Sequence, residues 1–203
     1  MTRLPTDVLV AGGGTAGHVV PALSVAVALV ARGHPAGSLH FVGSARGQEA
    51  QLVPAAGFTV TLLPGRGIAR RLTARTMLAN LGAVFGLCRA IAQAVVLVAR
   101  RRPRVVLSVG GYASVPAAAA AVLLRRPLVL HEQNAVPGSA NRLFARFARA
   151  SAVSFEGTAL PRAVLTGNPV RPEILAIDRS DAGRHAARAA LGLPGGAVVV
   201  AVV

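Results

Sequence analysis

The chain contains no lysine and no tryptophan, one tyrosine, one cysteine and only 7 acidic residues among 203. The single cysteine, Cys88, excludes a disulfide framework and a cysteine-based metal site within this sequence. Basic residues are not interleaved with aromatic ones, so the side chains that stack nucleic-acid bases are missing. No group of His, Asp and Glu has the spacing of metal ligands. We therefore expect no bound metal, no cofactor and no nucleic-acid partner.

What the chain does contain is arginine. All 22 basic residues are arginine, the formal net charge is +15, and 53% of the residues are hydrophobic, which is ample for a core. Two explanations stay open: codon usage in a GC-rich genome, and attraction to an anionic partner such as lipid headgroups or phosphorylated substrates. The start of the chain, with Arg3, Pro5 and Asp7, has no secretory pattern and predicts a cytoplasmic protein.

One glycine-rich turn organises the N-terminal part. Residues 8–11 form an apolar run of strand length, glycines follow, and a helix is expected to begin near His18 with Pro21 in its first turn. Glycines let the backbone bend sharply and approach a ligand, and the N–H groups at a helix start favour an anion. A lone turn of this kind is a weak signal, because purely structural turns share it.

A second turn of the same kind, residues 110–114, follows a predicted strand at 104–109 and precedes a helix at 115–124. Since parallel strands end at the same edge of a sheet, both turns are predicted to open onto one crevice, which suits a ligand with two phosphates. The next strand, 128–131, runs directly into polar residues at that edge, so three side chains can point into the crevice: His131, Glu132 and Asn134.

The remaining pattern predicts an α/β fold, a Rossmann-like parallel sheet with flanking helices. Further strands are expected at 39–43, 58–63 (a half-exposed edge), 150–155 and 163–166, and further helices at 46–56, 139–148 and 183–191. The predicted boundary separates a domain at 1–170 from a linker and the first strand of a second domain at 171–203. Residues 197–203 read as a buried strand, so the chain looks cut there. The remaining histidines are expected at the surface: His34, His40 and His185.

A long helix is predicted over residues 73–100, with an apolar surface wider than one core-facing stripe requires. No run has the length of a clean membrane span, because Arg89 and Gln93 interrupt the best candidate, residues 76–99. Two readings stay open: an interfacial helix rimmed by arginine, and an ordinary buried helix.

Four segments together, AGGGTAGHVVPA, SVGGYASVPAA, HEQN and TGNPVR, resemble the MurG family of peptidoglycan glycosyltransferases. The resemblance runs from about Val8 to Arg171. It implies the N-terminal half of a two-domain GT-B enzyme at the cytoplasmic face of the bacterial cell membrane. Such an enzyme transfers N-acetylglucosamine from UDP-GlcNAc to undecaprenyl-diphosphate-linked N-acetylmuramoyl-pentapeptide with inversion.

The resemblance also implies roles for individual residues. Donor contacts would come from Thr15, Ala16, Gly17, Asn134 and Arg171. The acceptor diphosphate would be held by Gly13, Gly14, His18, Gly110, Gly111, Tyr112 and Ser114. A peripheral patch on an anionic membrane would include Ile68, Arg70, Arg71, Leu72, Arg75, Leu78, Leu81 and Phe85.

The chemistry requires a base for the attacking hydroxyl. His18 and Glu132 are the candidates, and each also has a structural reading: His18 could bind phosphate or cap the helix, and Glu132 could satisfy backbone N–H groups. Two other functions are weighed. One is a membrane-bound module that binds the lipid diphosphate without catalysis. The other is a nucleotide-dependent oxidoreductase, disfavoured because the strand at 39–43 is followed by Ser44 and not by an acidic residue.

Overall fold

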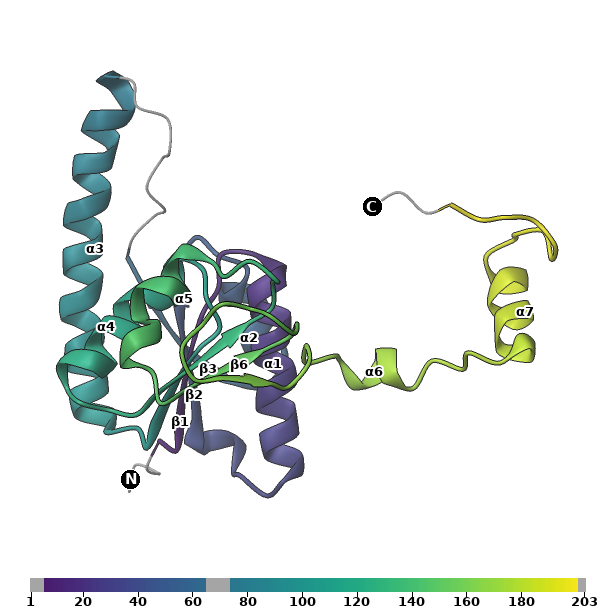
Figure 1. Cartoon of the computed structure of the whole chain (residues 1–203), viewed down its shortest axis with the longest axis horizontal. Helices are drawn as coiled ribbons and strands as arrows, with labels where there is room; N and C mark the ends of the chain where they lie inside the picture. The colour runs from purple at the N-terminus through teal and green to yellow at the C-terminus, as the bar shows by residue number, and fades with distance from the viewer. Residues whose placement is uncertain (1–5, 65–73, 201–203) are drawn as a thin grey trace. The chain divides into compact units, whose positions relative to one another are not determined.

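The structure, a computed structural model, describes residues 6–64 and 74–200 and divides into two compact units, Met1–Pro169 and Val170–Val203. The larger unit is built on a seven-stranded sheet in the order β3-β2-β1-β4-β5-β6-β7, in which all neighbouring strands are parallel (Figure 1). The strands are β1 (Val8–Ala11), β2 (Leu39–Ser44), β3 (Thr59–Leu63), β4 (Val105–Ser108), β5 (Leu128–Glu132), β6 (Ala150–Val153) and β7 (Ala163–Leu165).

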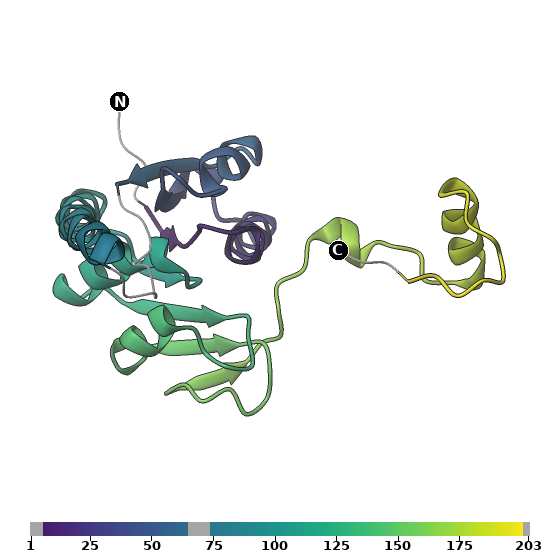
Figure 2. The same ribbon diagram turned by 90° about the horizontal axis from the view of Figure 1, so that it is seen from above.

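Helices cover both faces of this sheet. The core around α1 (Ala16–Ala31) and α2 (Glu49–Ala55) includes Val8 and Val10 of β1, whereas Leu9 and Ala11 belong to the core under α3 (Ala74–Arg101), α4 (Val115–Leu123) and α5 (Ser139–Phe144). Successive residues of a strand point to opposite faces, so a strand covered on both sides is apolar at every position. Helix α3 packs along α4 (Figure 2).

The described residues of the larger unit also form three short 3₁₀ helices: η1 (Ala36–Ser38), η2 (Tyr112–Ser114) and η3 (Ala145–Phe147). The predicted α/β fold is confirmed, and β3 lies at the sheet edge as expected. Several helices differ from prediction: α2 begins at Glu49 and not at residue 46, and α7 begins at Asp181 and not at residue 183. Helix α1 begins at Ala16, because the Thr15 carbonyl already accepts the N–H groups of His18 and Val19, and so Pro21 falls in its second turn. The helix predicted at 139–148 is divided into α5 and η3.

The prediction that His40 lies at the surface is wrong. His40 lies on β2 and is only 3% exposed. Its Nδ1 lies 2.8 Å from the Thr59 hydroxyl and its Nε2 lies 2.8 Å from the Thr61 hydroxyl, both on the neighbouring edge strand β3. Burial, followed by the positive charge of Arg101, lowers the pKa of His40 to about 4. The threonines that β3 places beside it make this burial tolerable, because both ring nitrogens have partners.

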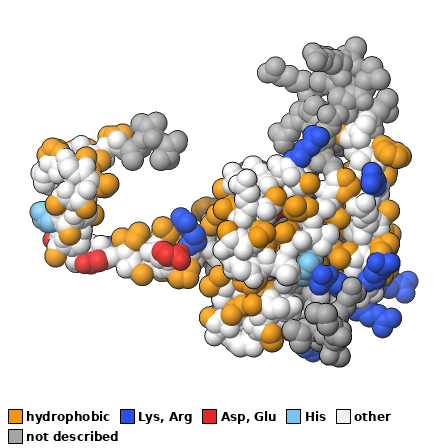
Figure 3. All heavy atoms as spheres, turned by 180° about the vertical axis from the view of Figure 1, so that it is seen from behind, with side chains coloured by type: hydrophobic (Ala, Val, Ile, Leu, Met, Phe, Trp, Pro, Cys, Tyr) orange, Lys and Arg blue, Asp and Glu red, His pale blue; other side chains and the backbone are white. Residues whose placement is uncertain are grey.

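Helix α3 contains the stretch for which the sequence predicted no clean membrane span. Among the described residues, the stretch Gly82–Arg101 is long and apolar enough, by length and composition only, to cross a membrane, and 22% of it is buried. A stripe of Ala83, Ala90, Ala94 and Val98 is buried, whereas Phe85 is 75% exposed. A core helix passes the same test of length and composition, so this finding alone does not assign a membrane span. Figure 3 shows arginine side chains gathered on the side of the larger unit that carries α3, among exposed hydrophobic ones.

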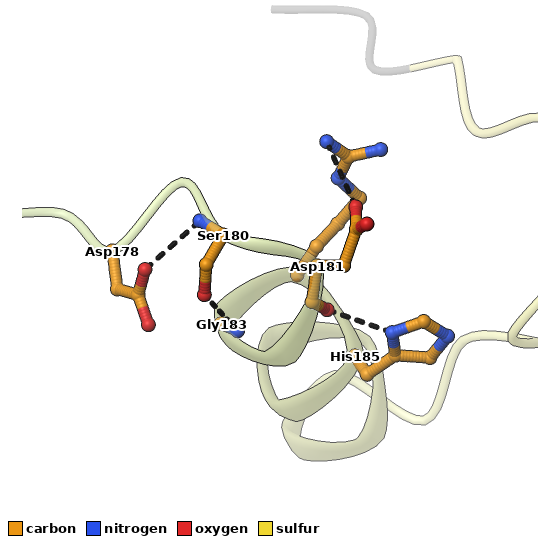
Figure 4. A network of polar contacts seen from close by, with 6 residues as sticks. Asp178, Ser180, Asp181, Gly183 and His185 are labelled. Carbon is orange, nitrogen blue, oxygen red and sulfur yellow. Dashed lines mark hydrogen bonds and ion pairs between the residues drawn. The ribbon is translucent and has the colours of Figure 1, made fainter.

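The smaller unit holds α6 (Pro172–Leu175) and α7 (Asp181–Ala190). The Ser180 hydroxyl caps α7 by accepting the Gly183 N–H at 3.1 Å, and Asp178 in turn accepts the Ser180 N–H at 2.9 Å (Figure 4). The strand expected at 197–203 is not formed in its described part, residues 197–200, and Val198 is 92% exposed. A strand requires a neighbour to pair with, and none of the described strands pairs with this segment.

Candidate functional site

A cavity of about 600 Å³ opens at the carboxyl edge of the sheet, within the larger unit. Its polar lining comes from His18 of α1, the turn Gly110–Gly111–Tyr112 after β4, Glu132 at the end of β5 and Asn134 just after it. Its apolar lining includes Leu63, Leu87, Ala90, Val115 and Leu143. The second glycine turn therefore lines the cavity, whereas His18 is the residue of the first glycine motif that does so, and the predicted shared crevice is formed only in part. The lining is amphipathic.

The two turns pack against each other so closely that side chains are excluded between them. A Cβ on Gly111 would lie 2.6 Å from the Gly13 carbonyl oxygen, and one on Gly14 would lie 3.0 Å from Cε1 of Tyr112. Gly110 and Gly111 also have φ values of +88° and +78°, which residues with a side chain rarely adopt. These glycines are thus required by the close contacts at the two turns and, at Gly110 and Gly111, by the backbone conformation.

His18 lies half-buried where the first turn meets the cavity. Its Nδ1 is 3.0 Å from the Thr15 hydroxyl, which orients the ring. Burial lowers the pKa of His18, while the negative charges of Glu132 and Glu49 partly oppose that change. The imidazole is therefore neutral near pH 7, the form in which it can accept a proton.

Glu132 is 1% exposed, and its oxygens are fully engaged. Oε1 accepts the backbone N–H and the side-chain amide of Asn134 at 3.0 and 2.9 Å, while Oε2 accepts the Gly138 N–H and the Asn141 amide, each at 2.9 Å. Burial acts to raise the pKa of Glu132, but these hydrogen bonds outweigh it and the pKa is lowered. Such a carboxylate holds Asn134 and the turn after β5 in place rather than offering a lone pair to a substrate proton.

Two residues that the sequence reasoning missed belong to this site. Glu49, at the start of α2, is 1% exposed and its Oε2 accepts the Gly14 N–H at 2.8 Å. Asn141 of α5 lines the cavity, is 1% exposed, and donates to Glu132 and to the His131 carbonyl. The signals were weak: two glycines at 43 and 47 precede Glu49, and Asn141 is a polar residue in the buried stripe of a basic helix.

The other predicted residues fall into three places. Thr15, Ala16 and Gly17 are exposed at the start of α1. Ser114 and His131 are buried; the Ser114 hydroxyl donates to the Gly111 carbonyl at 2.9 Å and so supports the second turn from behind. Arg171 belongs to the smaller unit, where it precedes α6.

The predicted membrane patch is described only in part. Phe85 is exposed on α3, while for Arg75, Leu78 and Leu81 only the helical backbone is described. Ile68, Arg70, Arg71 and Leu72 lie outside the described residues. Across the part of the chain that the structure describes, no three His, Cys, Asp or Glu side chains are grouped as metal ligands.

A parallel sheet with helices on both faces and a ligand-sized cavity at its carboxyl edge defines a Rossmann-like domain of the kind found in GT-B glycosyltransferases. The profile of the glycosyltransferase family 28 N-terminal domain matches residues 8–153. The chain belongs to this family.

Relatives agree with this assignment. The chain is 41% identical over 198 residues to the UDP-N-acetylglucosamine–N-acetylmuramyl-(pentapeptide) pyrophosphoryl-undecaprenol N-acetylglucosamine transferase of Desulforudis audaxviator, and 46% identical over 189 residues to that of Clavibacter sepedonicus. These alignments cover 95% and 93% of the chain, and 50% of each relative. The chain thus spans about half the length of the curated relatives it matches.

Solved structures give the same fold. The crystal structure of MurG from Acinetobacter baumannii matches with a TM-score of 0.66 at 27% identity, over 87% of the chain and 50% of that protein. Anabaena Alr3699/HepE in complex with UDP and glucose matches with a TM-score of 0.55 at 16% identity, over 93% of the chain and 50% of that protein, and shares the fold alone.

Proposed function

We propose that this chain forms the acceptor-binding half of an inverting hexosyltransferase. The enzyme moves N-acetylglucosamine from UDP-GlcNAc to the 4-hydroxyl of undecaprenyl-diphosphate-linked N-acetylmuramoyl-pentapeptide. The observation that carries the proposal is the amphipathic cavity, whose lining combines the second glycine turn and His18 with leucine side chains. A lipid-linked diphosphate has the matching chemistry, a charged group beside an apolar chain.

The second glycine turn is the better candidate for the acceptor diphosphate. In the first turn the Gly14 N–H already donates to Glu49, so that group is not available to a phosphate. Gly110, Gly111 and Tyr112 line the cavity directly, and His18 faces them. Gly13, Gly14 and Ser114 then contribute by shaping the two turns, while Thr15, Ala16, Gly17, Asn134 and Arg171 are proposed for the donor side.

In the reaction, the acceptor hydroxyl oxygen forms a bond to the anomeric carbon while the bond from that carbon to the UDP phosphate oxygen breaks. UDP leaves with the electron pair, and the hydroxyl proton must pass to a base. We assign the base to His18, because its imidazole is neutral and borders the cavity. Glu132 is assigned as a positioning residue, since its four hydrogen bonds leave no lone pair directed at the substrate.

We also propose that the enzyme lies at the cytoplasmic face of the cell membrane as a peripheral protein. Support comes from the exposed Phe85 on α3 and from the arginines on the same side of the larger unit (Figure 3). Exposed apolar side chains rimmed by arginine are what an anionic lipid surface attracts.

A binding module without catalysis is the second candidate, favoured by the position of the whole cavity lining within the larger unit. Tyr112 makes the test simple, because it is the only tyrosine and the chain has no tryptophan. Its fluorescence should change on titration with farnesyl diphosphate, and much less with farnesol or inorganic pyrophosphate. Equal responses to all three ligands, or no response to any, would reject the acceptor site.

Flotation with liposomes and a transferase assay on the same protein separate the two candidates. Flotation that requires anionic lipid, without turnover of a lipid-linked acceptor, supports the binding module as the function of these 203 residues. Turnover by the chain alone would show that both substrates bind within it. Loss of turnover in His18→Ala with unchanged farnesyl diphosphate binding would then support the assignment of His18 as the base.

A further inference from the structure

Glu49 is a buried carboxylate directly behind the first glycine turn, and nothing in the proposed reaction uses it. Its Oε2 accepts the Gly14 N–H at 2.8 Å, and its Oε1 accepts the Ser44 N–H at 2.6 Å. Within residues 6–64 and 74–200 no arginine or histidine forms an ion pair with it. Burial of a carboxylate is costly unless its oxygens are hydrogen-bonded, so these two bonds are what keep Glu49 in place.

The surrounding backbone is shaped to admit this one side chain. A Cβ on Gly13, on Gly43 or on Gly47 would overlap atoms of the Glu49 side chain. These glycines come from three segments: the first glycine turn, the end of β2, and the loop between β2 and α2. The carboxylate therefore occupies a place that the three segments form together.

A chain of contacts leads from Glu49 to the cavity wall. Ser44, whose N–H binds Glu49, accepts a hydrogen bond at its Oγ from the Tyr112 hydroxyl at 3.1 Å. Tyr112 lines the cavity, and its ring lies against Gly14, the other residue that Glu49 holds. One carboxylate thus connects both glycine turns.

From this arrangement we propose that Glu49 is a positioning residue of the site. This inference rests on the proposed function. Its carboxylate fixes the Gly14 amide away from the cavity and, through Ser44, fixes the Tyr112 ring on the cavity wall. It does not contact substrate. Its removal should weaken diphosphate binding by releasing the two turns from each other.

The test compares Glu49→Gln with Glu156→Gln, which makes the same chemical change at an exposed position. A carboxamide has one acceptor oxygen, so either the Gly14 or the Ser44 N–H loses its partner. We expect hydrogen exchange at one of these amides to accelerate about tenfold or more. Quenching of Tyr112 fluorescence by acrylamide should rise, and farnesyl diphosphate affinity should fall about tenfold. Glu156→Gln should match the parent chain in all three measurements.

Ser44→Ala provides a second variant that keeps Glu49 and the Ser44 N–H while removing the hydroxyl that Tyr112 contacts. It should raise Tyr112 quenching and leave the Gly14 amide protected, and it still tests the link from Ser44 to Tyr112 if Glu49→Gln does not fold. The proposal is overturned if Glu49→Gln folds and leaves Tyr112 quenching and affinity at parent values, or if Ser44→Ala does not raise Tyr112 quenching. If the parent chain itself does not bind farnesyl diphosphate, the proposed function fails, while amide exchange and quenching still report on Glu49.

Discussion

Replacement of Glu132 by glutamine should destabilise the larger unit by an amount that its hydrogen bonds predict. The carboxylate accepts four hydrogen bonds, two at each oxygen, from Asn134, Gly138 and Asn141. A glutamine keeps one acceptor oxygen and presents an NH₂ group to the two remaining donors. A buried donor without a partner costs about 1–3 kcal/mol. Part of this cost is offset because the variant no longer buries a charge. We therefore expect Glu132→Gln to lower the free energy of unfolding by about 2–4 kcal/mol.

The assay is urea unfolding followed by Tyr112 fluorescence, which reports on the larger unit alone because no other tyrosine or tryptophan is present. The midpoint should fall with an unchanged slope, and the exposed Glu156→Gln should unfold like the parent. The pKa of Glu132 is lowered in the folded state, so its contribution is present above the unfolded value of about 4.5 and is lost as pH falls through the folded value. A cost below about 0.5 kcal/mol at pH 7 would refute the reasoning, since surface substitutions give that much.

Three further predictions follow from single residues. Gly111→Ala should abolish farnesyl diphosphate binding and lower the free energy of unfolding by about 2 kcal/mol or more, because the added methyl group clashes with Gly13 and the backbone is left-handed. Gly57 has φ +81° with open space around it, so Gly57→Ala should lower the free energy of unfolding by only about 1 kcal/mol. Equal costs for the two alanines would argue against close contact between the turns. His40 is buried with a pKa of about 4, so its contribution to the free energy of unfolding, at most about 3 kcal/mol, should be lost as pH drops from 6.5 toward 4. The urea midpoint of His40→Asn should therefore fall less steeply with pH than that of the parent, and a parallel slope would contradict the reasoning. Ser180→Ala should cost about 1 kcal/mol of α7 stability, seen as faster hydrogen exchange at the Gly183 amide, and unchanged exchange would show that the cap contributes nothing.

The sheet could be predicted from the sequence because its strands are short apolar runs bounded by glycine and by helical periodicity. β1 and β4 are apolar at nearly every position, as strands covered on both faces must be. The two glycine turns were found for the same local reason, and parallel topology alone placed them at one edge. The details that failed depend on partners far along the chain.

His40 and Glu49 show this limit. The burial of His40 depends on Thr59 and Thr61, which reach it only when β3 pairs with β2. The role of Glu49 depends on an amide 35 residues earlier, and an acidic residue at a helix start usually needs no more explanation than the helix dipole. The strand predicted at 197–203 is not formed in residues 197–200, because a segment of strand-like composition forms a strand only beside a neighbouring strand.

The most direct test of the account is a backbone amide NMR titration of the chain with farnesyl diphosphate. If both turns border one diphosphate site, the signals of His18, Gly110 and Gly111 should shift together and saturate with a single dissociation constant. Shifts confined to one turn, or separate saturation of the two, would contradict the shared site on which the transferase assignment depends.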